Sequence, residues 1–272
     1  MRATIGARAL CVLLSAGWLA PEPAAAEDVP VDLELILAVD VSGSMDVEEQ
    51  RLQRAGYVAA LTDPQILAAI RSGTYGRVAM AYVEWAGSTA QSLTAPWSLV
   101  DDGESAEAFA QRVAAAPLAR FRGTSISGAL AFSAPLFEGN GYEGMRRVID
   151  VSGDGPNNMG PPVVPVRDAV LEQGIVINGL PIMLRPSQTG TMDIPALDVY
   201  YTDCVIGGPA SFVLAVQEPG QLAEAIRQKL VLEIAGLPPR VVPAAEQRAT
   251  RGPRIDCMVG ERLRRSWEWG DR

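Results

Sequence analysis

The sequence predicts an α/β protein with a doubly wound, mostly parallel sheet and helices on both faces. Apolar runs of strand length alternate with stretches of helical periodicity from residue 31 to residue 235. The first strand leads directly into a capped helix, as in an α/β unit. Because strands that alternate with helices pair in parallel, the central sheet is expected to be buried between two helical layers.

The first unit consists of a strand and a long helix. The stretch VDLELILAVD (31–40) is apolar and predicts a buried strand. The stretch DVEEQRLQRAGYVAALTD (46–63) has apolar residues at helical spacing. Asp46 and Glu49 stand three residues apart at its start, which predicts a capping box.

A second helix and two more strands follow. The stretch ILAAIRSG (66–73) continues helically after Pro64 and ends at a glycine. The stretch GRVAMAYVEWAG (76–87) is rich in β-formers and predicts a strand, and a third strand is expected around residues 93–100.

The middle of the chain predicts two helices before the next strand. SAEAFAQRVAAA (105–116) has helical spacing, and TSISGALAFSAPLF (124–137) predicts a helix that opens at Thr124 or Ser125. RRVIDVSGDG (146–155) is short, β-branched and bounded by glycine, and therefore predicts a strand.

The last units repeat the alternation. VPVRDAVLEQG (164–174) predicts a helix that ends at its glycine, and IVINGLPIML (175–184) predicts a strand. SFVLAV (211–216) is expected to be the final strand, and QLAEAIRQKLVLEIAG (221–236) the final helix of the domain.

Composition narrows the possible chemistry. The chain has 272 residues and a formal net charge of −9, and an acidic surface argues against a nucleic-acid partner. It contains no histidine, which removes Ser-His-Asp and Cys-His catalysis and every histidine-containing zinc site. Any chemistry must therefore come from carboxylates, hydroxyls and amides, with or without an oxygen-binding cation.

The amino terminus predicts secretion. Residues 1–26 contain two arginines, an apolar run from Ala9 to Ala20 and a stretch of small residues that ends at Ala26, as in a cleaved signal peptide. The run is too short to span a membrane, and no later stretch is longer. We expect a periplasmic or secreted protein whose domain covers residues 27–236.

The carboxyl-terminal residues 237–272 predict an extended appendage rich in proline and arginine. Cys11 lies in the predicted signal peptide, so Cys204 and Cys257 remain as an even pair in an oxidising compartment. A disulfide between them would tether the appendage to the domain. The alternative is two separate buried thiols.

Polar residues gather at predicted strand ends, where ligands bind in doubly wound sheets. They are Asp40, Ser42, Ser44, Thr124 and Asp154. Two carboxylates and three hydroxyls form an all-oxygen set that suits Mg²⁺, with some contacts made through water. Taken alone, the stretch LAVDVSGSMD (37–46) could instead be a turn whose side chains bind the backbone.

The stretch DVSGSM resembles the metal-ion-dependent adhesion site (MIDAS) of von Willebrand factor type A (VWA) domains, which pairs Asp-x-Ser-x-Ser with a distant Thr and a distant Asp. VIDVSGDGPNN and YYTDCVIGGPASFV resemble a secreted bacterial subgroup, domain of unknown function 1194. The resemblance implies a Rossmann-like VWA fold in which Ser42 and Ser44 bind the cation directly. It also implies that Thr124 binds directly or through water, and that Asp40 and Asp154 act mainly through water.

The third loop departs from the family pattern. Many members have Thr before the final Asp-Gly, whereas Gly153 stands there in this chain. Asp150 shares a strand face with Asp154 but lies deeper in the sheet, so a structural role with hydrogen bonds is expected. Trp85 is expected in the core, and the pair Asn157–Asn158 is expected to build the loop.

Three functions remain open for this set of residues. The first is a binding module without enzymatic activity, in which Mg²⁺, or alternatively Mn²⁺ or Ca²⁺, captures a carboxylate on a protein partner. The second is a metal-assisted hydrolase in which Asp150 or Asp154 positions water. The third is a structural domain of an envelope complex with an unused metal site.

Overall fold

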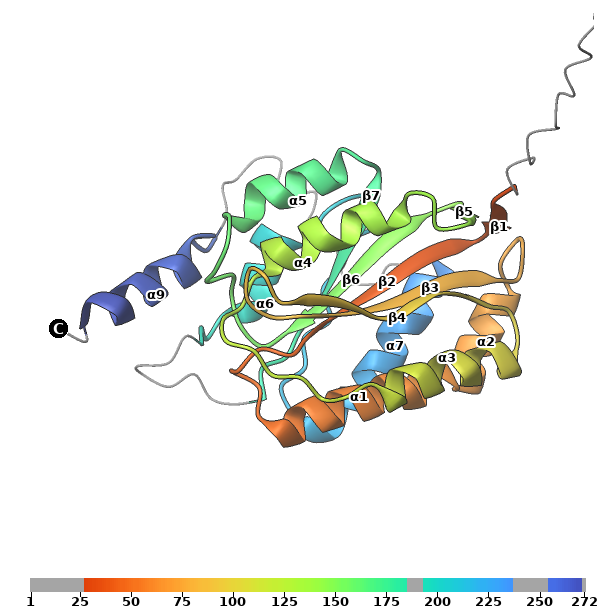
Figure 1. Ribbon diagram of the computed structural model, residues 1–272, viewed down its shortest axis with the longest axis horizontal. Helices are drawn as coiled ribbons and strands as arrows, with labels where there is room; N and C mark the ends of the chain where they lie inside the picture. Colours follow the sequence, from red (N-terminus) through yellow and green to blue (C-terminus); the bar gives the residue numbers. More distant parts are fainter. Residues whose placement is uncertain (1–26, 185–192, 237–253, 271–272) are drawn as a thin grey trace, which may run out of the picture.

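The computed structural model describes residues 27–184, 193–236 and 254–270 (Figure 1). The predicted signal peptide and residues 237–253 of the predicted appendage lie outside the described residues. The strands are β1 (Val29–Val31), β2 (Leu33–Asp40), β3 (Val78–Trp85), β4 (Gln91–Val100), β5 (Tyr142–Gly144), β6 (Arg147–Gly153) and β7 (Ile175–Pro181). The helices are α1 (Val47–Leu61), α2 (Pro64–Arg71), α3 (Gly103–Ala115), α4 (Ile126–Ser133), η1 (Ala134–Phe137), α5 (Val163–Leu171), α6 (Leu197–Tyr200), η2 (Tyr201–Val205), η3 (Pro219–Gln221), α7 (Leu222–Ala235) and α9 (Val259–Gly270).

The predicted doubly wound sheet is confirmed. Its strand order is β4-β3-β2-β6-β7, with all neighbours parallel except the antiparallel pair β3–β4. The chain passes from β2 to β3 on one side and later returns to β6 on the other side. The strand order therefore reverses at β2, and a crevice for ligands is expected beyond its carboxyl end.

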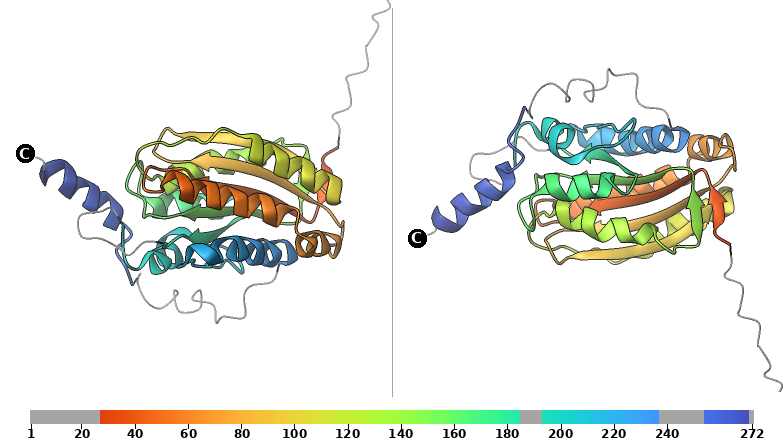
Figure 2. Two further views of the ribbon diagram at one scale, coloured as in Figure 1. Left: turned by 90° about the horizontal axis from the view of Figure 1, so that it is seen from below. Right: turned by 90° about the horizontal axis from the view of Figure 1, so that it is seen from above.

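The core consists of two apolar layers that alternate along β2. Leu35 and Leu37 point into the layer beneath α1, α3 and α7, whereas Ile36 and Ala38 point into the layer beneath α4 and α5. Figure 2 shows the first helical layer from below and the second from above. Because both faces are covered, every residue of β2 is buried, and this rigid strand fixes the position of Asp40 at its end.

The capping box of α1 forms as predicted. The backbone N–H of Glu49 donates to the Asp46 carboxylate at 2.9 Å, and the backbone N–H of Asp46 donates to the Glu49 carboxylate at the same distance. These two bonds satisfy donors that a helix start leaves open. They fix where the chain turns from the strand-end loop into α1.

The prediction of a regular strand at residues 211–216 is wrong. This segment runs beside β7 but forms only isolated bridges at Val213 and Val216. The N–H of Gly179 donates to the Phe212 carbonyl at 3.1 Å, but the next donor position on β7 is Pro181, which has no N–H. The missing hydrogen bond interrupts the ladder.

The prediction of an extended appendage is also wrong for its described part. Residues 259–270 form the helix α9, which lies beyond the carboxyl ends of the sheet strands, at the left of Figure 1. The Asp256 carboxylate accepts from the N–H of Met258 at 2.9 Å at the start of this helix, and Arg264 and Glu268 pair one turn apart at 2.8 Å. These local contacts favour a helix.

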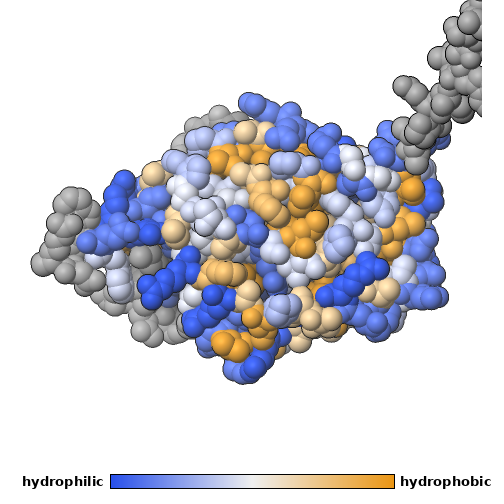
Figure 3. Space-filling view, in the orientation of Figure 1, coloured by the Kyte–Doolittle hydropathy of each residue, from blue (hydrophilic) through white to orange (hydrophobic). Residues whose placement is uncertain are grey.

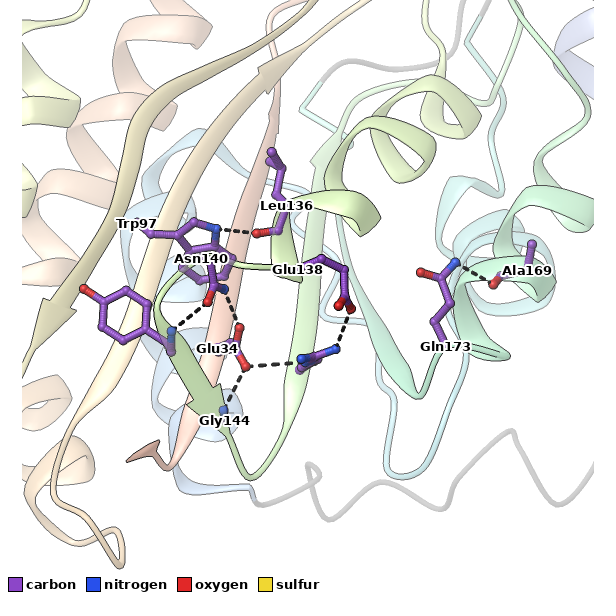
Figure 4. Close-up of polar contacts among 10 residues, drawn as sticks. Glu34, Trp97, Leu136, Glu138, Asn140, Gly144, Ala169 and Gln173 are labelled. Carbon is purple, nitrogen blue, oxygen red and sulfur yellow. Dashed lines mark hydrogen bonds and ion pairs between the residues drawn. The ribbon is translucent and has the colours of Figure 1, made fainter. Parts of the chain in front are cut away.

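The opposite, amino end of β2 is closed by a polar network around the buried Glu34 (Figure 4). Its carboxylate accepts from the N–H of Gly144 at 2.8 Å and from the side chain of Asn140 at 2.5 Å. The indole of Trp97 donates to the Leu136 carbonyl at 2.7 Å nearby. These bonds satisfy a buried carboxylate, so this end of the sheet is occupied by structural contacts.

Candidate metal centre

The loop after β2 and the loop after β6 meet through a chain of hydrogen bonds. The backbone N–H of Ser42 donates to Asp40 Oδ1 at 2.6 Å, which turns the loop sharply. The hydroxyls of Ser42 and Ser44 are 2.7 Å apart, and the Ser44 hydroxyl donates to Asp154 Oδ1 at 2.6 Å. Four of the five residues predicted from the sequence are thus in one connected cluster.

The fifth residue, Thr124, lies on the loop before α4 and contacts the loop that follows Asp154. Its side chain is buried, and a Cβ placed on Gly155 would lie 3.7 Å from its Oγ1. The N–H of Thr124 donates to Asn158 Oδ1 at 2.9 Å, and the Thr124 carbonyl accepts from the N–H of Asn158 at 2.8 Å. Thr124 is therefore fixed directly beside the loop that carries Asp154.

Hydrogen bonds to backbone carbonyls hold the loop after β2 and the loop before α4 together. The N–H of Phe121 donates to the Val41 carbonyl at 3.3 Å, and Arg120 Nη2 donates to the Gly43 carbonyl at 2.5 Å. A Cβ on Gly43 would stand 3.3 Å from the Phe121 carbonyl oxygen, so the close approach favours glycine. These bonds preorganise the cluster before any ligand arrives.

The two carboxyl groups of the cluster have strongly perturbed acidities. Burial raises the pKa of Asp40 to about 7. Burial and the nearby Asp40 carboxylate raise the pKa of Asp154 well above its ordinary value. Two buried carboxylates repel each other when both are ionised, so a bound cation would stabilise their charged forms.

Sequence reasoning missed Tyr201, which belongs to this cluster. Its hydroxyl and Asp40 Oδ2 are both buried and have no hydrogen-bond partner among the described residues. Both atoms lie 2.9 Å from the point where a Cβ on Gly153 would stand. The glycine that departs from the family pattern therefore makes room for the tyrosine, and the unusual Gly before Asp154 was the signal in the sequence.

Replacing Gly153 with alanine is expected to destabilise the fold by about 1–3 kcal/mol, because the new methyl group overlaps Asp40 and Tyr201. Gly155→Ala is the matched control two residues later. Its Cβ would meet only ordinary contacts at 3.7 Å or more. Denaturant unfolding of both variants measures the difference, and equal stability of the two would contradict this account of Gly153.

The cluster fits a hard divalent cation. Its donors are all oxygens, namely three hydroxyls and two carboxylates, and Asp40 Oδ2 is a buried acceptor with no partner among the described residues. The described residues contain no group of three or more Asp, Glu, His or Cys side chains placed to hold a metal. The hydroxyls of Ser42, Ser44 and Thr124 would therefore have to complete the coordination of such an ion.

The other sequence candidates have structural roles. Asp150 is buried and forms an ion pair with Lys229 of α7, as expected for a structural carboxylate. Trp85 is fully buried in the core. Asn157 Oδ1 accepts from the N–H of Ser127 at 3.0 Å and so ties the loop after β6 to the first turn of α4.

The two cysteines among the described residues lie together. Cys204 and Cys257 form a disulfide with their Cα atoms 5.5 Å apart. The bond joins η2 to the segment before α9, so it brings α9 to the carboxyl edge of the sheet.

The model of the protein family of unknown function DUF1194 matches residues 30–238. The chain belongs to this family. No curated protein sequence matches the chain. The match includes all five residues of the cluster and ends before α9.

Solved structures show that this DUF1194 protein has a VWA-like fold. It superposes on the pilus adhesin SpaC from Lactobacillus rhamnosus GG with a TM-score of 0.54 at 14% identity, over 77% of this chain and 31% of the adhesin. It superposes on proximal thread matrix protein 1 from the mussel byssus, solved with a zinc-occupied MIDAS motif, with a TM-score of 0.51 at 13% identity, over 77% of this chain and 47% of the mussel protein. For a von Willebrand factor type A protein from Catenulispora acidiphila, the TM-score is 0.50 at 17% identity, over 75% of this chain and 43% of that protein. The chain spans less than half of each of these proteins.

Proposed function

We propose that this protein is a secreted or periplasmic binding module that uses a divalent cation to bind an acidic side chain of a partner protein. The observation that carries the proposal is the hydrogen-bonded cluster of Ser42, Ser44 and Asp154 beside a buried oxygen of Asp40 that has no hydrogen-bond partner among the described residues. The predicted signal peptide supports the location. Among the described residues, no helix has the length and apolar character needed to cross a membrane.

The donor chemistry favours Mg²⁺, with Mn²⁺ and Ca²⁺ as alternatives. Ser42, Ser44 and Thr124 would hold the ion with neutral hydroxyl oxygens, and Asp40 and Asp154 would hold its bound water. A cation held largely by neutral ligands keeps attraction for an additional anion. The protein's own residues therefore favour capture of a carboxylate from outside.

Binding is better supported than metal-assisted hydrolysis. A hydrolase would use Asp150 or Asp154 to position water. Asp150 is instead buried against Lys229, and Asp154 accepts from the Ser44 hydroxyl within the cluster. The zinc-occupied MIDAS of the mussel protein, on the same fold, supports a divalent cation at the corresponding edge of this sheet.

Calorimetric titration of the mature protein with Mg²⁺ and Mn²⁺ tests the proposal. The wild type is expected to bind one ion, and Ser42→Ala with Ser44→Ala is expected to weaken binding by roughly 100-fold or more, since both hydroxyls contact the ion. Ser92→Ala with Ser98→Ala, which removes two hydroxyls from β4, is the matched control and should bind as the wild type does. Absence of binding by the wild type, or unchanged binding by the first variant, would reject the metal site.

A further inference from the structure

The helix α9 lies outside the residues that define the family match, yet it is fixed close to the candidate metal centre. Asn157 Nδ2 donates to Glu261 Oε1 of α9 at 2.8 Å. A Cβ on Gly260 would stand 2.1 Å from the Asn157 carbonyl oxygen, so only glycine permits this approach. Together with the disulfide at Cys257, these contacts hold α9 against the loop that follows Asp154.

A cavity of about 500 Å³ lies between α9 and the metal loops. Ser44, Thr124 and Gly155 line one side of it. Arg264, Trp267 and Glu268 of α9 line the other side. A ligand on the cation would therefore occupy a space that α9 helps to enclose.

The charges around this cavity differ from those of the whole chain. The protein carries a formal net charge of −9, whereas the cavity is lined by Arg122 and Arg264 and by two acidic residues, Asp193 and Glu268, so its lining is formally neutral. Arg122 is exposed and forms no ion pair among the described residues, and Arg264 pairs only with the exposed Glu268 one turn away. Such an exposed pair contributes little, so a ligand anion can replace Glu268 at small cost.

The α9 side of the cavity also offers apolar surface. Trp267 is 49% exposed although tryptophan is usually well buried, and indole rings are common anchors in protein interfaces. The end of the molecule that carries α9 is otherwise mostly hydrophilic, whereas apolar residues gather over the middle of the face in Figure 3. An exposed indole in these surroundings suits a contact with a bound peptide.

We infer that α9 forms the second wall of the ligand site and selects an acidic peptide segment with two acidic residues. This inference rests on the proposed function. One carboxylate of the segment binds the cation, the second pairs with Arg122 and Arg264, and the chain between them packs on Trp267. The partner is thus a protein with an exposed acidic stretch, not one with a single isolated carboxylate.

Selection from a displayed library of random peptides tests this surface. The mature, disulfide-bonded protein is the target, binding is carried out with Mg²⁺, and bound peptides are eluted with EDTA. Peptides enriched on the wild type are expected to carry two acidic residues. The best peptide should bind about ten-fold more weakly to Arg122→Ala and to Arg264→Ala, because each loses a charge-assisted hydrogen bond.

Arg262→Ala is the matched control, because Arg262 lies on α9 but pairs with Asp256 and does not line the cavity. It should bind the selected peptide as the wild type does. Metal-dependent enrichment of peptides with one acidic residue, or equal binding by all three arginine variants, would overturn the inference and leave the proposed function intact. No EDTA-eluted enrichment at all would reject the proposed function and the inference with it.

Discussion

Replacing Lys229 with methionine is expected to lower the free energy of unfolding by about 3–5 kcal/mol at neutral pH. Lys229 is the only lysine in the chain, is fully buried on α7, and forms ion pairs with Asp150 and Glu233, which are also buried. Methionine keeps a similar volume but leaves the two carboxyl groups without this cation. Denaturant unfolding at pH 7 measures the loss.

This loss should grow as the pH rises. Burial raises the pKa of Glu233 from 4.5 to about 8 and also raises the pKa of Asp150. Above the ordinary pKa of a carboxyl group, these two groups therefore hold protons in the folded protein that they release in the unfolded chain. Their contribution to the free energy of unfolding declines as the pH rises toward 8. Without Lys229 the folded state must keep an additional proton on these carboxyl groups. The variant should therefore lose more free energy of unfolding at pH 8 than near pH 4.5.

Arg227→Met is the matched control on the same helix. Arg227 pairs with the exposed Glu224 at the surface, so its loss should change stability far less than the loss of Lys229. If the Lys229 variant were as stable as this control, or lost the same free energy at both pH values, the buried ion pairs would not carry the stability assigned to them.

Removing the disulfide with Cys204→Ala and Cys257→Ala is expected to lower the free energy of unfolding by about 4 kcal/mol. The bond joins residues 53 positions apart, and closing a loop of this length restricts the unfolded chain by about that amount in the chain-entropy model. Denaturant unfolding under non-reducing conditions measures the loss.

The same variant tests what holds α9 in place. Amide hydrogen exchange should become faster in residues 259–270, because the covalent link is lost and the hydrogen bond from Asn157 to Glu261 then has to hold α9 to the loop after β6. Ion affinity should stay unchanged, since none of the five cluster residues lies on α9. Unaltered stability together with unaltered exchange in α9 would contradict this role of the disulfide.

Much of the fold could be predicted because its signals are local. The buried run of β2, the capping box at Asp46 and the glycine-bounded β6 each depend on neighbouring residues. The final strand was mispredicted because one proline on its partner, Pro181, interrupts the ladder from a distant position in the sequence. The helix α9 was missed because the proline- and arginine-rich composition of the tail indicates an extended segment, whereas the pairs of opposite charge that favour a helix are confined to its last residues.

The candidate site was also predictable from local signals only in part. Asp40, Ser42 and Ser44 follow one strand, and their spacing alone suggested a shared ligand. Thr124 and Asp154 could be added because parallel strands end at one edge of the sheet. The unusual Gly153 indicated that space is needed there but did not identify Tyr201, because the π-helix that follows α6 and carries Cys204 brings the tyrosine hydroxyl to Asp40.

By itself the sequence determined the alternating α/β order and the set of oxygen donors at the strand ends, because hydrophobic period and residue chemistry are properties of neighbouring positions. Tertiary structure alone decided that Lys229 pairs with Asp150, that Gly153 makes room for Tyr201, and that α9 lines the cavity beside the loops of the candidate site. These are contacts between segments far apart in the chain. Their partners are selected by packing, which no local pattern records.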